Sequence, residues 1–409
     1  MWYYVQHVLI PHQRRDAALH GAPRGNLSDL YPRWLGAREL LLHHRDPYSA
    51  DITREIQTGY YGRPLDSSRA QDPRDQQAFA YPAYVVFLLA PTIYSPFETV
   101  QIWFRPFLMI MIVATVLLWL RGIRWQPPPC VFAILILLTL GSFPALQAIK
   151  LQQLSAVVSL LLAGSVAVLV SGHLLSAGFL LALATIKPQL ALPLAGWLTL
   201  WALSDLRRRW RFVAGFVITM TLLVGAAQWI LPGWLCRFRS AVSAYREYTG
   251  GGKSLLDVLL STPIGTGVTL MLVIALFFLC WRARSKTEQE TEFSLTTALV
   301  TAATVVVIPT FAPYNQLLLL PGIFLLIRSR HHLWQKKWPF RMACLAAAFV
   351  LVWPWMAAAA LVLASFVLQS QLVEGAWTLP LYTSLVVPVA VCGLLVPLAL
   401  ESALSKPAG

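Results

Sequence analysis

Charged residues are scarce in this chain. Asp, Glu, Lys and Arg make up 12% of its 409 residues, and hydrophobic residues make up 57%, whereas about a quarter of a typical soluble domain is charged. Cysteine is scarce as well, with five scattered residues and no CxxC pair, which argues against a disulfide framework or a cysteine metal site. This composition excludes a soluble globular protein and indicates one that crosses the membrane several times.

Common catalytic signatures are also missing. The sequence has no HExxH, GxSxG or dinucleotide-binding motif, and the glycine run before Lys253 lacks the spacing of a P-loop. Alternating ten-residue segments, typical of membrane β-barrels, do not occur. We therefore predict an all-α fold, a polytopic transmembrane helical bundle, and a mechanism without metal or cofactor.

Apolar stretches near the roughly 20 residues needed to cross a bilayer recur along the chain. They predict about ten to twelve spans: a short segment at Tyr84–Ile93, then Thr99–Leu120, Val131–Leu146, Leu154–Val170, Leu174–Trp201, Phe212–Ile230, Ile264–Cys280, Leu295–Ala312, Leu317–Ile327, Cys344–Leu368 and Leu379–Leu400. We divide the chain into an N-terminal anchor with an external loop (1–82), a first membrane module (83–231), an external loop (232–263) and a C-terminal membrane module (264–409). The first eleven residues are too short to span, so they form either an interfacial anchor or the end of a truncated first helix; we favour the second.

The net charge of +14 does not indicate nucleic acid, because the cations form short clusters between apolar runs. Under the positive-inside rule, the clusters at 207–211, 282–286 and 328–341 lie in the cytoplasm. Leu174–Trp201, interrupted by Lys187 and Pro188, is either one long broken helix or a two-helix hairpin. In either arrangement we place the polar segment Asn26–Pro82 outside.

Asn26–Pro82 is the one long polar segment, and half of the 18 acidic residues precede Tyr81. The spacing of apolar residues from Leu30 to Leu42 predicts an amphipathic helix on the membrane surface. Asp29 either caps this helix, a role that Ser28 could also fill, or serves as a general base at the bilayer edge.

Two further features of this segment have structural explanations. Asp46, Pro47 and Tyr48 predict a turn that ends the helix, with the Asp side chain bonded to its own backbone. The aromatic residues Phe79 and Tyr81 return the chain to the membrane and suit an interfacial belt.

Lys187 is the most informative cation, because it lies in an apolar stretch far from any basic cluster. Such a lysine either snorkels to the interface or lines a wet cavity, where it could bind a phosphate. Lys150 lies in a similar polar interruption. Asn315, with Gln316, either closes a tight loop or donates hydrogen bonds to a ligand. Residues 245–254 predict an external loop over the site.

The order of these features resembles the membrane glycosyltransferases of the GT-C class, in particular family 87, the mannosyl- and arabinosyltransferase-like proteins. The matching stretches are SDLYPRWLGARELLLHHRDPY, AFAYPAYVVFLLAP, LQQLSAVVSLLLA, ATIKPQLALPL with RRRWR behind it, GGKSLLDVL and PYNQLLLLP. The chain departs from the pattern in its short N-terminus, in Tyr81-Pro82-Ala83, and in the absence of a His at residues 313–315.

The resemblance implies an inverting transferase in the cell membrane. It would move a sugar from a polyprenyl-phosphate donor to a hydroxyl of a glycolipid or glycan on the extracytoplasmic face. By motif position Asp29 is the catalytic residue. The implied substrate-binding residues are Arg38, Asp46, Tyr48, Tyr81, Gln153, Lys187, Gln189, Lys253 and Asn315.

Two other functions fit the same features. A flippase for lipid-linked sugars would use the cations to bind a phosphate without chemistry, so Asp29 would be dispensable and Lys187 would not. A non-catalytic scaffold for envelope synthesis would need neither residue.

Overall fold

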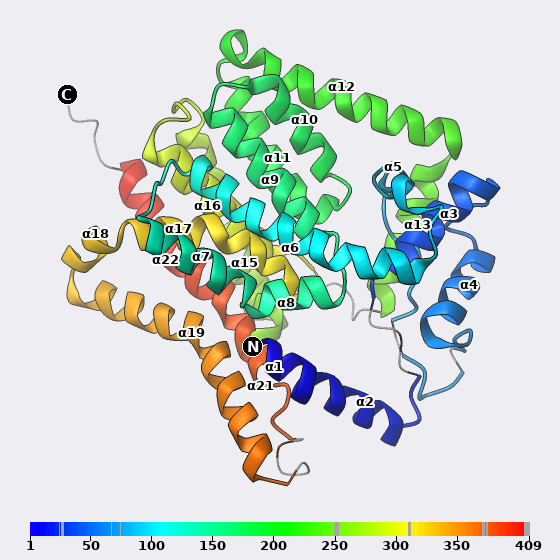
Figure 1. Cartoon of the computed structure of the whole chain (residues 1–409). Coiled ribbons are helices and arrows are strands. Elements are labelled where there is room, and N and C mark those ends of the chain that lie inside the picture. The colour runs from blue at the N-terminus through cyan, green and yellow to red at the C-terminus, as the bar shows by residue number, and fades with distance from the viewer. Residues whose placement is uncertain are drawn as a thin grey trace.

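The computed structural model describes residues 1–23, 25, 28–66, 68–73, 75–248, 253–309, 312–369, 373 and 375–404. Within these ranges every regular element is helical (Figure 1), so the all-α prediction is confirmed. Most predicted spans coincide with helices. In lipid, the backbone N–H and C=O groups of a long apolar run find no water, so they must form hydrogen bonds with one another, as they do in a helix.

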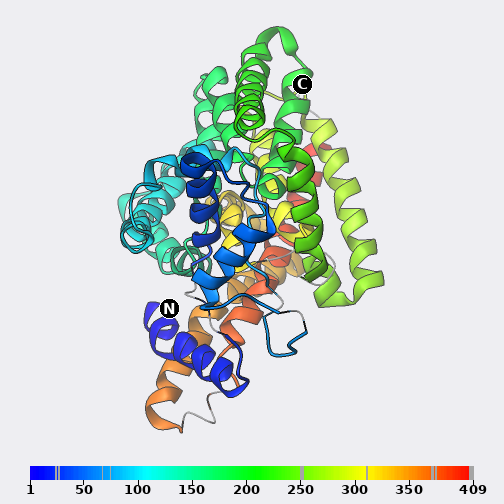
Figure 2. The same cartoon turned by 90° about the vertical axis from the view of Figure 1, so that its right-hand side faces the viewer.

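The N-terminal part contains the short helices that precede the bundle. They are α1 (Trp2–Tyr4), the π-helix η1 (Val5–Leu9), α2 (Ile10–Leu19), α3 (Tyr31–His43), α4 (Ala50–Tyr61), α5 (Val85–Leu89) and the 3₁₀ helix η2 (Ala90–Thr92). The first three form one helical run whose apolar side packs against α19 through a small separate core that includes Tyr4 and Leu361. α3 and α4 lie together with α13 at one side of the molecule (Figures 1 and 2).

The central helices build most of the bundle. They are α6 (Phe97–Gly122), α7 (Pro129–Leu140), α8 (Phe143–Lys150), α9 (Ser155–Val170), α10 (Leu174–Ala184), α11 (Pro188–Leu203), α12 (Leu206–Ile230) and α13 (Trp234–Tyr248). Proline begins α7 and α11 at the first helical position, where its missing N–H costs nothing.

The C-terminal part completes the bundle. It comprises α14 (Leu255–Leu260), α15 (Thr262–Ala283), α16 (Thr291–Val307), the 3₁₀ helix η3 (Pro313–Leu319), α17 (Leu320–Arg328), α18 (Arg330–Gln335), α19 (Trp338–Val367), α21 (Leu379–Thr383), the 3₁₀ helix η4 (Ser384–Val386) and α22 (Val387–Leu404). One apolar core extends from Leu30 to Ala399 and joins all three parts.

Fewer helices are long enough to span than the sequence predicts. Within the described residues, five are long and apolar enough to cross a membrane, or six if α7 and α8, bent by 51°, form one broken span. α9, α10 and α16 are apolar but shorter. The predicted ten to twelve spans are therefore not confirmed, because a continuous apolar run in sequence folds here into two short helices at several places.

The stretch 174–201 is a two-helix hairpin. Before α10, Ser171 accepts a hydrogen bond from Arg121 at 3.1 Å, and nearby Arg124 donates to the carbonyl of Gln289 at 3.0 Å. Beyond α11, Ser204 donates to the carbonyl of Arg284 at 2.5 Å, so both outer ends of the stretch lie near residues 284–289. The turn with Lys187 lies at the other end of the hairpin. The basic clusters at 207–211 and 282–286 meet at the outer ends, since Arg209 donates to the carbonyls of Arg284 and Lys286.

Candidate active site

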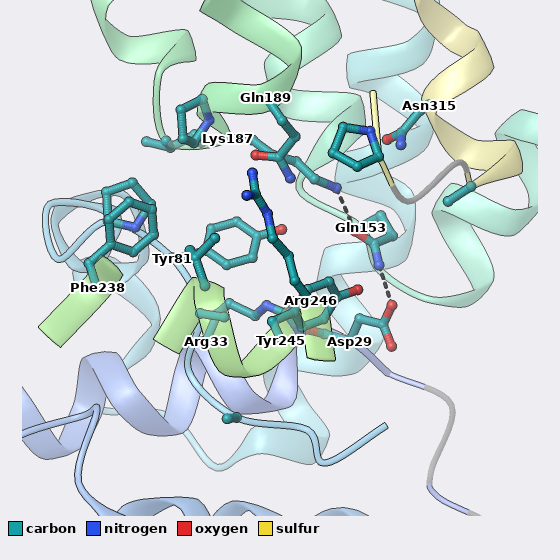
Figure 3. A pocket seen from close by; sticks show the side chains of 18 of the residues that line it. Asp29, Arg33, Tyr81, Gln153, Lys187, Gln189, Phe238, Tyr245, Arg246 and Asn315 are labelled. Carbon is teal, nitrogen blue, oxygen red and sulfur yellow. Dashed lines mark hydrogen bonds between the residues drawn. The ribbon is translucent and has the colours of Figure 1, made fainter. Parts of the chain in front are cut away.

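A cavity of about 960 Å³ opens beside the Lys187 turn (Figure 3). One wall comes from the polar segment Asn26–Pro82. The other walls are the turn before α9, the start of α11, one face of α13 and the start of η3. Five cations and two carboxylates line it: Arg33, Lys187, Arg239, Arg246, Lys253, Asp29 and Asp75. The cavity thus combines an acidic group with an excess of positive charge.

The backbone around Asp29 is attached to the turn between α8 and α9. The Asp29 N–H donates to the carbonyl of Leu151 at 2.8 Å, and the Ser28 hydroxyl donates to Oε1 of Gln152 at 2.6 Å. Gln152 adopts the left-handed conformation, with φ of 51°, and its Nε2 donates to the carbonyl of Gln101 at 2.7 Å. These contacts hold the loop residue in a defined position against the bundle.

The Asp29 side chain does not cap α3. The N-cap position is Leu30 and has no side-chain hydrogen bond, so the capping interpretation of Asp29 and Ser28 is wrong. The carboxylate instead accepts a hydrogen bond from Nε2 of Gln153 (Figure 3). Burial raises the pKa of the Asp29 carboxyl, while the charges of Arg33 and Lys187 oppose this rise. A carboxylate with a raised pKa in a cleft is suited to accept a proton.

Lys187 is 5% exposed and points into the cavity, so it does not snorkel. Its Nζ donates to Oε1 of Gln153 at 3.2 Å and to the Ser155 hydroxyl at 2.6 Å. It also lies 4.9 Å from the centre of the Tyr314 ring. No described carboxylate forms an ion pair with this ammonium group, so its charge is available to an anionic ligand.

The sequence predictions for the site divide into two groups. Seven of the predicted residues line the cavity: Asp29, Tyr81, Gln153, Lys187, Gln189, Lys253 and Asn315. Asn315 accepts a hydrogen bond from Ser155 at 3.0 Å, which extends the network around Lys187. The glycines at 250–252, part of the predicted loop over the site, lie outside the described residues.

Arg38, Asp46 and Tyr48 do not line the cavity. Arg38 lies 5.4 Å from the centre of the Trp34 ring. Asp46 accepts a hydrogen bond from the Tyr48 N–H at 3.0 Å, as the predicted turn requires, and pairs with Arg237 at 3.0 Å. The preceding helix ends earlier than predicted, at His43. The Tyr48 hydroxyl donates to the carbonyl of Tyr81 at 2.6 Å, so this turn shapes the cavity wall.

The sequence analysis did not single out four of the lining residues: Arg33, Asp75, Arg239 and Tyr314. Tyr245 and Arg246 belong to the segment predicted as a loop over the site, but in the structure they lie in the last part of α13. Arg239 and Arg246 are seven residues apart on α13, a spacing that places both on one helical face. Burial raises the pKa of Tyr245 to about 12, so its phenol stays protonated near neutral pH. No group of three or more His, Cys, Asp or Glu side chains suited to a metal occurs among the described residues.

Comparison with known proteins shows the family of the chain. Residues 79–309, more than half of the chain, match the family model of glycosyltransferase family 87. The matched range includes Tyr81, Gln153, Lys187 and Lys253, while Asp29 precedes it. No curated protein and no solved structure matches the chain. With a family match over most of the membrane bundle, this chain belongs to glycosyltransferase family 87.

Proposed function

We propose that this glycosyltransferase moves a sugar from a polyprenyl-phosphate donor to a hydroxyl group of a glycolipid or glycan. The observation that supports this most directly is that Gln153 joins the Asp29 carboxylate to the Lys187 ammonium group within one cavity. A base and an unpaired cation are the two groups that the reaction needs. No cofactor is required, because the donor already holds an activated leaving group.

In the proposed step, Asp29 accepts the proton of the acceptor hydroxyl. The hydroxyl oxygen forms a bond to the anomeric carbon of the sugar from the face opposite the phosphate, so the configuration inverts. The bond between that carbon and the phosphate oxygen breaks, and polyprenyl phosphate leaves with both bonding electrons. Lys187 stabilises the negative charge that develops on the phosphate.

A second, apolar cavity of about 370 Å³ suits the isoprenoid tail. It lies between α5, η2, α6 and α9, and its lining includes Trp103, Phe107 and Leu154. Leu154 follows Gln153 directly, so the two cavities lie on either side of one turn. A lipid could therefore place its phosphate beside Lys187 and its tail in this second, apolar cavity. Burial of the apolar surface of the tail would provide affinity.

We place the reaction on the extracytoplasmic face of the cell (inner) membrane. The basic clusters meet at the end of the bundle opposite the Lys187 turn, and the positive-inside rule assigns that end to the cytoplasm. A mannose-like or arabinofuranose-like sugar is the proposed group for transfer.

The test is sugar transfer in membranes supplied with a polyprenyl-phosphate sugar. Asp29→Asn removes the base and is expected to lower the transfer rate by roughly a hundredfold or more. Asp51→Asn is the matched control, because Asp51 lies on the surface of α4 and pairs with Arg54. Transfer by Asp29→Asn at the wild-type rate would disprove the proposal.

A further inference from the structure

Arg33 lies one helical turn after Asp29, at the start of α3, and lines the same cavity. Its Nη1 donates to the carbonyl of Asp29 at 2.5 Å, and its guanidinium carbon lies 4.7 Å from the centre of the Tyr81 ring. These two contacts hold the planar group at the wall of the cavity (Figure 3).

The guanidinium group is not fully satisfied by the protein. Its Nε is shut off from solvent and has no hydrogen-bond partner among the residues that the structure describes. Among the described residues, no carboxylate forms an ion pair with Arg33. A buried donor without a partner, on a group that is always charged, is costly unless a ligand completes it. The fork of N–H groups on Arg fits two oxygens of one phosphate.

Lys187, on another wall of the cavity, likewise forms no ion pair with a carboxylate of the described residues. Its hydrogen bonds go to the neutral groups of Gln153 and Ser155. The charges of Arg33 and Lys187 influence each other, and both act on the Asp29 carboxylate. Two cations without acidic partners facing one cavity indicate a ligand that brings more than one negative charge.

We infer that Arg33 is a phosphate-binding residue that holds the leaving phosphate of the donor together with Lys187. This inference rests on the proposed function and names a residue for it that the sequence did not indicate. Arg38, which the resemblance implied as a substrate-binding residue, lies against Trp34 and does not line the cavity, whereas Arg33 does. The base then lies just before α3 and the phosphate-binding cation lies in its first turn, and the hydrogen bond from Arg33 to the Asp29 carbonyl limits their separation.

The experiment measures binding of farnesyl phosphate, a short polyprenyl monophosphate, to the full-length protein in detergent, with farnesol as the uncharged comparison. Arg33→Gln is expected to weaken binding of farnesyl phosphate by roughly tenfold or more. Binding of farnesol should not change. Arg38→Gln, on the same helix, is the matched control and should bind both ligands as the wild type does.

Arg33→Lys addresses the possibility that Arg33→Gln fails to fold. This variant keeps the positive charge and should retain part of the affinity for farnesyl phosphate. If Arg33 had a purely structural role, the affinity would not depend on whether residue 33 is charged. In transfer assays with Arg33→Lys, the KM for the donor should rise while the KM for the acceptor stays the same. A rise confined to the acceptor would assign Arg33 to an acceptor anion and overturn the inference.

The remaining outcomes separate the two proposals. If the wild type prefers farnesyl phosphate to farnesol and Arg33→Gln keeps that preference in full, the role of Arg33 is wrong and the proposed function stands. If the wild type shows no preference for the phosphate, the phosphate-linked donor is wrong and the role of Arg33 falls with it.

Discussion

Nε2 of Gln153 donates a hydrogen bond to Oδ2 of Asp29, 124 residues earlier in the chain. The orientation of the amide is set from its other side, where Oε1 accepts a hydrogen bond from the Lys187 ammonium group. A flipped amide would place N–H groups against that cation. Lys187 therefore orients Gln153, which in turn holds Oδ2 of Asp29. In the proposed reaction, Oδ1 is the atom that accepts the proton of the acceptor hydroxyl.

Gln153→Leu tests this arrangement. The hydrogen bond from Gln153 lowers the pKa of Asp29, so its loss should raise that pKa and move the acid limb of the pH–rate profile to higher pH. Loss of orientation should also lower kcat by roughly tenfold. Gln189→Leu is the control, because Gln189 lines the cavity and no hydrogen bond joins it to Asp29. An unmoved acid limb in Gln153→Leu would contradict the proposed role.

The acid limb of the wild-type pH–rate profile should lie at a higher pH than the ordinary pKa of an aspartate side chain. Burial raises the pKa of the Asp29 carboxyl, and only the ionised form can accept a proton. As the pH falls through this raised pKa, kcat/KM should therefore fall about tenfold per pH unit. Profiles of kcat/KM for the wild type and Asp29→Asn provide the measurement. The residual activity of Asp29→Asn should lack the acid limb. If the wild type and the variant show the same acid limb, that limb reports the titration of a group other than Asp29.

Scarcity of charge made part of the site predictable. Lys187 stood out because a charged group in an apolar stretch needs a partner or a wet cavity. Asp29 was chosen by its position at the start of a predicted amphipathic helix and in the motif order of the family. The Lys187-Pro188 pair marked a break in the apolar run, but the sequence left a broken helix and a hairpin open. The prediction of an all-α membrane protein rested on the same composition.

Contacts between distant segments could not be predicted from the sequence. Arg33 appears there as an ordinary cation of a surface helix, and only the docking of Asp29 on Leu151 places it in the cavity. The arginines of α13 lay within what the sequence suggested was a loop. The predicted number of spans was not confirmed, because hydropathy does not show where an apolar run divides into shorter helices.

Two glycines allow α10 and α12 to approach closely. A Cβ at Gly178 would lie 2.1 Å from the carbonyl oxygen of Phe212, and one at Gly215 would lie 2.2 Å from that of Leu175. Small residues at such crossings permit close packing of membrane helices. Gly178→Ala should therefore lower the unfolding free energy by about 1–3 kcal/mol. Thermal unfolding in detergent measures it, with Gly196→Ala as control because that position faces open space. Equal loss in both variants would contradict the packing argument.

Lys187→Met should strongly lower the transfer rate without weakening the fold. Lys187 is buried and has no acidic partner in the part of the chain that the structure describes, so its charge costs stability that an apolar side chain does not. The unfolding temperature should be unchanged or higher, while the transfer rate falls by roughly a hundredfold or more. Lys150→Met is the control, because Lys150 donates to Gln13 and does not line the cavity.

Together with Asp29→Asn, the Lys187→Met variant separates the three functions that fit the sequence. An enzyme of the proposed kind requires both residues, since the base and the phosphate-binding cation act in one step. A flippase would lose lipid binding in Lys187→Met and tolerate Asp29→Asn, and a scaffold would tolerate both. Transfer assays and farnesyl phosphate binding on the same preparations provide the comparison. Full transfer by Lys187→Met would exclude a role for its charge in the reaction.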